Sequence, residues 1–166
     1  MRGEADRLHE IARDLKASPA DAADRVRRLF TQIKALEKEL QEARRRASRD
    51  LVGEILGKAV QAGPVTVLAA EVEPMDAASL RELADKVKGK MKSGILLLGS
   101  VQGDRCHLVA GVTEDLLSSY SANDIVKKAA AFVGGGGGGR RDMAQAGGSK
   151  VERLREALGS ISAWVK

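Results

Sequence analysis

The chain has 166 residues, which is close to the roughly 150 residues of a typical single domain. It carries 28 Lys and Arg residues against 23 Asp and Glu residues, giving a net charge of +5, and 43% of its residues are hydrophobic. This composition excludes a disordered polar tail. The longest aliphatic run, residues 95–98, is far shorter than the roughly 20 residues of a membrane helix. We therefore expect a basic globular protein with no membrane partner.

The cysteine and aromatic content narrows the class of protein further. The single cysteine, Cys106, can form neither an internal disulfide nor a multi-cysteine zinc site. Aromatic residues make up only 2% of the chain, which argues against a domain that reads bases by stacking them on exposed rings. The first residues contain no apolar secretion segment. The sequence thus predicts a cytoplasmic protein with no metal site.

Residues 1–62 are predicted to form a helical arm, either a helical hairpin or a coiled coil. Leu8, Ile11 and Leu15 recur at helical spacing and predict a first helix over about residues 3–17. The segment Ser18-Pro19-Ala20-Asp21 is typical of a capped helix start, and no helix breaker follows before about residue 60. The pair Gly63-Pro64 disfavours helix, so we place the boundary with the next domain there.

The second predicted helix has an apolar residue at alternating steps of three and four, as in a coiled coil. We define this seam by Val26, Leu29, Ile33, Leu36 and Leu40. Such a long helix cannot cover its own seam, so the seam is predicted to pack on the first helix, on a second copy in a homodimer, or on another part of a larger protein. A basic run at residues 44–46 is read as a solvated helix face, with phosphate contact as the alternative.

Residues 63–166 alternate strand-like and helix-like patterns and predict a small globular α/β or α+β domain. Strands are expected at residues 65–73, 95–101 and 105–113, where apolar residues occupy both alternating faces. Helices are expected at about 76–91, 123–133 and 150–165. A compact sheet with helices packed on it follows from this order.

A run of six glycines follows the helix expected at 123–133, and two arginines come directly after it. Glycines allow close approach of a ligand to the backbone, successive backbone N–H groups can bind an anion, and arginine forks suit phosphate. The sequence therefore predicts a glycine-rich loop that clamps a phosphodiester. Its candidate residues are Gly134, Gly135, Gly136, Gly137, Gly138, Gly139, Arg140 and Arg141.

The glycine run has one structural alternative, and two known phosphate-binding motifs are excluded for it. A flexible polyglycine linker is the structural alternative. A Walker loop is excluded because no Lys-Ser or Lys-Thr follows the glycines, and a dinucleotide fingerprint is excluded because the run follows a helix rather than a strand.

Three neighbouring residues join the candidate site. Lys127 and Lys128 precede the glycines within two helical turns, and we expect them to contact RNA. Gln145 is expected to hydrogen-bond a base or ribose, with a purely structural role as the alternative. Asp142 cannot favourably face phosphate and is expected to cap or orient Arg140.

The segment GGGGGGRRDMAQAGG, residues 134–148, resembles the glycine-rich signature of the C-terminal, DHH-associated domain of bacterial alanyl-tRNA synthetases. That domain family also occurs in RecJ-like phosphoesterases. The segments ILLLGSV, LVAGVT and DIVKKAAAFVGG follow the family's order, so the resemblance covers nearly the whole chain. Two departures stand out: the family often has lysine at the position of Gly136, and proline is common at the position of Arg141.

This resemblance implies a non-catalytic tRNA-binding appendage. In the family, such a module grips the outer corner of tRNA(Ala) and links alanylation with the editing of mischarged tRNA, and the helical part contributes to dimers. The remainder of the synthetase is then a partner, and ATP and zinc belong to domains that this chain does not contain. The alternatives are a purely structural dimerisation module and a single-stranded nucleic-acid-binding accessory domain of the RecJ-like kind.

Overall fold

The computed structural model describes residues 2–165, except for the side chains of residues 2, 44–46, 48 and 49. The phosphate contact considered for the basic run at residues 44–46 lies outside the described side chains. The chain divides into two compact units, residues 1–49 and residues 50–166. In this division the end of the long helix and the short strand before Gly63 fall in the second unit, so that compact unit begins before the predicted boundary.

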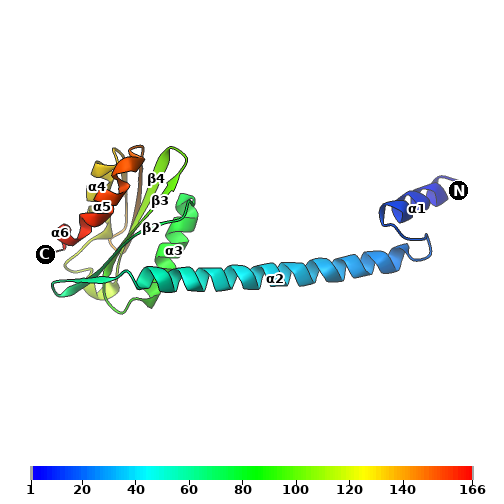
Figure 1. Cartoon of the computed structure of the whole chain (residues 1–166), viewed down its shortest axis with the longest axis horizontal. Helices are drawn as coiled ribbons and strands as arrows, with labels where there is room; N and C mark the ends of the chain where they lie inside the picture. The colour runs from blue at the N-terminus through cyan, green and yellow to red at the C-terminus, as the bar shows by residue number, and fades with distance from the viewer. Residues whose placement is uncertain (1, 166) are drawn as a thin grey trace. The chain divides into compact units, whose positions relative to one another are not determined.

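The N-terminal unit consists of α1 (Arg2–Asp14) and the greater part of α2 (Ala22–Leu56). Both helices were expected, and the capping segment between them forms as predicted: Ser18 Oγ accepts the N–H of Asp21 at 3.2 Å. The helix itself begins only at Ala22. Figure 1 shows α1 in blue and α2 running from blue to cyan.

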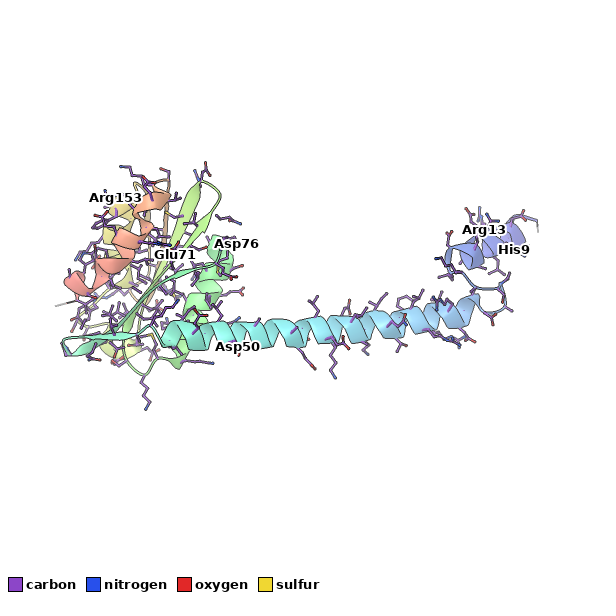
Figure 2. The ribbon with its side chains drawn as sticks, in the orientation of Figure 1. His9, Arg13, Asp50, Glu71, Asp76 and Arg153 are labelled. Atoms are coloured by element: carbon purple, nitrogen blue, oxygen red, sulfur yellow. The ribbon has the colours of Figure 1, made fainter. Side chains whose placement is uncertain are left out.

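The seam of α2 is largely uncovered within this chain. Val26 and Leu29 are half-buried, whereas Ile33, Leu36 and Leu40 are 51%, 63% and 51% exposed. The side chains along this stretch of α2 project outward in Figure 2. Packing on α1, one of the predicted arrangements, therefore does not bury these three side chains.

The second unit is built on a six-stranded sheet with the order β1-β2-β3-β4-β6-β5. Only the β2–β3 pair is parallel, and the other pairs are antiparallel. The fold is therefore α+β rather than a fully parallel α/β arrangement. The strands are β1 (Val60–Ala62), β2 (Val65–Val72), β3 (Ile95–Gln102), β4 (Arg105–Val112), β5 (Gly136–Gly139) and β6 (Met143–Gly148).

Helices cover both faces of this sheet, as Figure 1 shows. One face packs against α4 (Ala122–Phe132), α5 (Leu154–Gly159) and α6 (Ile161–Trp164). The other packs against α3 (Ala77–Lys90) and the last turns of α2, where Val52 and Ile55 are 2% and 1% exposed. The central strands are buried on both faces, which explains their apolar residues at successive positions.

The predicted strands at 65–73, 95–101 and 105–113 are confirmed with small shifts at their ends. The single final helix predicted over 150–165 is wrong. That segment is divided into a 3₁₀ turn at Val151–Arg153 followed by α5 and α6. The break falls at Gly159 and Ser160, in keeping with glycine as a frequent helix terminator.

Candidate nucleic-acid interface

The glycine run is mainly a strand rather than the predicted loop. Gly134 adopts a φ of 63° just after α4, and the N–H of Gly135 donates to the carbonyl of Ala130 at 3.0 Å, which closes the helix end. Gly136–Gly139 then form β5, an edge strand paired antiparallel with β6. The loop prediction fails for these four glycines because β6 supplies partners for their peptide groups.

The glycines of this strand are not equivalent sterically. A Cβ atom on Gly135 would collide with the carbonyl of Gly147, and one on Gly137 would collide with the backbone of Gln145 and Ala146. A Cβ on Gly136 would meet nothing within 4 Å. A Cβ on Gly139 would also collide with the backbone of β6. These three glycines are therefore required by the close approach of the segment to β6, whereas Gly136 leaves an open position on the surface.

Two adjoining hollows follow the β5–β6 hairpin. The larger has a volume of about 620 Å³ and the smaller about 130 Å³. Both are lined by Gly138 and Gln145, so they meet at the middle of the hairpin. We call the two together the hairpin groove. Its other charged or polar lining side chains are Arg105, His107 and Ser149 in the larger hollow, and Arg81 and Arg140 in the smaller.

Arg140 is held by a neighbouring carboxylate. Its Nε and one terminal nitrogen donate to the two oxygens of Asp142 at 2.9 and 3.0 Å, and Lys88 Nζ of α3 donates to Asp142 at 3.2 Å. The hydrogen bond from Arg140, helped by Lys88, lowers the pKa of Asp142 to about 2. The expectation that Asp142 orients Arg140 is confirmed. The guanidinium keeps further N–H donors, and its side chain is 72% exposed.

Arg141 points away from Arg140. It donates to the carbonyl of Leu117 at 2.7 Å, beside the segment that leads into α4. The two arginines lie in the turn between β5 and β6 and bond to different partners, Asp142 and Leu117, so they do not form the single fork that their adjacency suggests.

The two lysines lie on the exposed side of α4. Lys127 approaches β5, with its Cε 3.9 Å from the Cβ position of Gly138. Neither Lys127 nor Lys128 lines the hairpin groove. The structure thus brings Gly134–Gly139, Arg140 and Gln145 together at the groove and places Arg141, Lys127 and Lys128 away from it.

Several cations around the hairpin are not predicted by the sequence. Arg81 comes from α3 and Arg105 from the start of β4, and both side chains are exposed. The carbon atoms of Lys150 lie 3.1 to 3.2 Å from the Cβ position of Gly134, so this side chain crosses the start of the glycine segment. No local motif marks these residues, because the tertiary fold brings them to the hairpin. Arg105, for example, reaches it only because β4 pairs with β6.

The site offers binding groups rather than a recognisable set of reactive ones. Among the described residues, no three His, Cys, Asp or Glu side chains gather where they could hold a metal ion. Burial raises the pKa of the Cys106 thiol. The described helices also include none with the length and apolar character needed to cross a bilayer.

Comparisons with known proteins agree with this architecture. The DHHA1 domain profile matches residues 64–166. The alanine–tRNA ligase of Idiomarina loihiensis is 43% identical over 159 residues, and that of Saccharophagus degradans is 44% identical over 162 residues. These alignments cover 96% and 98% of this chain but 18% of each relative. The chain therefore spans about a fifth of the length of these relatives.

A solved structure also resembles this chain in sequence and fold. The C-Ala domain from Aquifex aeolicus alanyl-tRNA synthetase superposes with a TM-score of 0.61 at 28% identity, covering 64% of this chain and 96% of that one. The resemblance noted in the sequence is confirmed. With its α+β fold and glycine edge strand, the chain belongs to the DHHA1 domain family.

Proposed function

We propose that this chain is a tRNA-binding module of an alanyl-tRNA synthetase and performs no catalysis itself. Its relatives carry the name alanine–tRNA ligase, and the chain is basic, with a net charge of +5. The observation that carries the proposal is the hairpin groove, whose glycine strand exposes backbone between arginine side chains.

The physical basis is recognition of RNA shape through phosphates and sugars. Arginine side chains attract the phosphate backbone and contribute most of the salt-dependent affinity. A strand without side chains lets the RNA backbone approach the peptide groups closely. A folded tRNA presents such a surface at its outer corner, where loops meet and unpaired bases are exposed. In this proposal the module holds the outer corner of tRNA(Ala) and thereby links alanylation with editing of mischarged tRNA.

The experiment is a binding titration of the whole chain with a tRNA(Ala) transcript at several salt concentrations. Replacing both Arg140 and Arg141 by Ala is expected to weaken binding and to reduce the salt slope by up to about one unit per lost phosphate contact. The matched control replaces Arg25 and Arg28 of α2, which removes the same charge elsewhere. The proposal fails if the unaltered chain does not bind tRNA, or if the Arg140 and Arg141 variant binds as the control does.

Competition separates this function from the single-stranded accessory role seen as an alternative. A tRNA-shape reader is expected to prefer folded tRNA(Ala) over unstructured poly-U of equal length. Stronger competition by poly-U would favour the accessory role.

A dimerisation role is a second candidate, and the exposed part of the α2 seam favours it. It does not conflict with tRNA binding, because the seam and the hairpin groove belong to different units.

A further inference from the structure

We propose that one RNA strand crosses the face of the β5–β6 hairpin that adjoins α3, with Arg105 and Arg81 binding phosphates at the two ends of its path. This inference rests on the proposed function and assigns the contact to one face of the hairpin. Neither arginine belongs to the glycine signature.

The two hollows of the groove follow one another along the hairpin. β5 and β6 run antiparallel with Gly136 opposite Gly147 and Gly139 opposite Ala144. The larger hollow lies at the Gly147 end and the smaller at the Ala144 end, and Gly138 and Gln145 line both. A strand that follows the groove therefore passes from one hollow to the other over Gln145.

The helix α3 forms a wall of this path. Ala77, in its first turn, lines the larger hollow, and Arg81 lines the smaller one. Asp76, labelled in Figure 2 at the beginning of α3, helps to locate this wall. In the sheet, β4 lies beside β6 with Cys106 opposite Gly148, so Arg105 stands just beyond the Gly147 end of the hairpin.

The charges favour a polyanion at both ends. Arg105 and His107 line the larger hollow, and Arg81 and Arg140 line the smaller. Asp142 near the second end is already paired with two cations, Arg140 and Lys88. At the first end, Asp76 uses its carboxylate to accept the N–H of Ser79 at 2.8 Å.

The middle of the path is neutral and suits a base or sugar. Glycines line this part of β5, and the exposed amide of Gln145 provides both a donor and an acceptor. Among the described residues, no Phe, Tyr or Trp side chain lines either hollow, and His107 is the one ring there. We therefore expect affinity to come mainly from phosphate and amide contacts, with little stacking.

The test measures tRNA(Ala) affinity of the whole chain with Arg105→Gln and Arg81→Gln, each compared with Arg155→Gln. Arg155 lies on α5, on the other face of the sheet, where its side chain is 87% exposed. Each groove variant is expected to lose about tenfold in affinity and about 0.7 to 0.9 units of salt slope. The Arg155 control should stay within about twofold, because it removes the same charge away from the groove, where Arg155 pairs with Glu71 instead.

A second variant keeps the charge of the two ends intact. Gln145→Glu changes one amide to a carboxylate at the exposed centre of the path and is expected to weaken binding by more than about tenfold through repulsion of phosphate. The inference is overturned if the unaltered chain binds tRNA while Arg105→Gln, Arg81→Gln and Gln145→Glu all bind like the control. Absence of binding by the unaltered chain would contradict the proposed function itself.

Discussion

At the level of single residues, neighbouring glycines of β5 differ in the space available for a side chain. Gly137 approaches the backbone of β6 so closely that a Cβ atom would collide with it, whereas Gly136 faces open space. The run of identical letters in the sequence hides this difference.

We expect Gly137→Ala to lower the free energy of unfolding by about 1 to 3 kcal/mol or more, because it forces β5 away from β6. Gly136→Ala, the matched control, should change it by no more than about 0.5 kcal/mol. Urea unfolding followed by fluorescence reports on this unit, since Trp164 is the only tryptophan and lies in α6. Equal effects at the two positions would contradict the close-packing explanation.

The carboxylate of Asp142 gives a pH-dependent contribution to stability. Its pKa is about 2 in the folded chain against an ordinary value of 3.8, so the ionised form stabilises the fold above about pH 4 and this contribution is lost as the pH falls toward 2. Asp142→Asn should therefore cost about 1 kcal/mol at pH 7, after allowance for partial exposure, and much less near pH 2.

Urea unfolding at both pH values measures that difference. The control is Asp104→Asn, at an exposed turn position, for which we expect the same small effect at both pH values. A cost for Asp142→Asn that does not shrink with falling pH would show that the ion pairs with Arg140 and Lys88 are not its source.

The sequence predicted which residue types form the site but not how they are oriented. Glycine, arginine and glutamine were identified from their chemistry, and Asp142 was correctly assigned to Arg140 because a carboxylate needs a cation close by. Arg141 points instead to the carbonyl of Leu117. That carbonyl belongs to a turn whose position depends on the tertiary fold, so no spacing rule could reveal it.

At the level of elements, β5 was the least predictable. Glycine has a low intrinsic preference for strands, and its extended conformation here depends on pairing with β6. The strands of the core, by contrast, followed from apolar residues at successive positions, as at Leu96 and Leu97, because both faces of the sheet are covered.

The exposed seam of α2 predicts self-association. Leu36→Asp together with Leu40→Asp should abolish dimers seen by sedimentation at micromolar concentration, because charges within a coiled-coil seam oppose its burial. Ala35→Asp with Gln41→Asp adds the same charge beside the seam and should leave the dimer intact. An unaltered chain that sediments as a monomer at these concentrations would contradict the prediction.

At the level of the whole molecule, the boundary lies inside one continuous helix. The sequence did not show this boundary, because α2 has no helix breaker between the arm and the core; only the apolar spacing changes, to steps of four at Leu51 and Ile55. Val52 and Ile55 are buried within the second unit, whereas the seam residues Ile33, Leu36 and Leu40 are exposed.

Truncation tests where the second unit begins. Residues 50–166 should fold and bind tRNA(Ala) much like the whole chain, whereas residues 63–166 lack β1 and the buried side chains of Val52 and Ile55. Burying two such side chains stabilises a fold by about 3 to 6 kcal/mol, so the shorter piece should unfold at a clearly lower urea concentration. Equal midpoints by Trp164 fluorescence would place the boundary at Gly63 after all.

The edge position of β5 has a consequence for how this protein behaves at high concentration. An edge strand with bare peptide groups is open to pairing with a strand from another molecule, and glycine provides no bulky side chain to hinder it. Asn123 occupies one of the outward positions by accepting the N–H of Gly139 at 3.2 Å, and Lys127 adds a positive charge close by. We therefore expect these two side chains of α4 to hinder pairing of this edge with a strand of another molecule, and so to reduce aggregation.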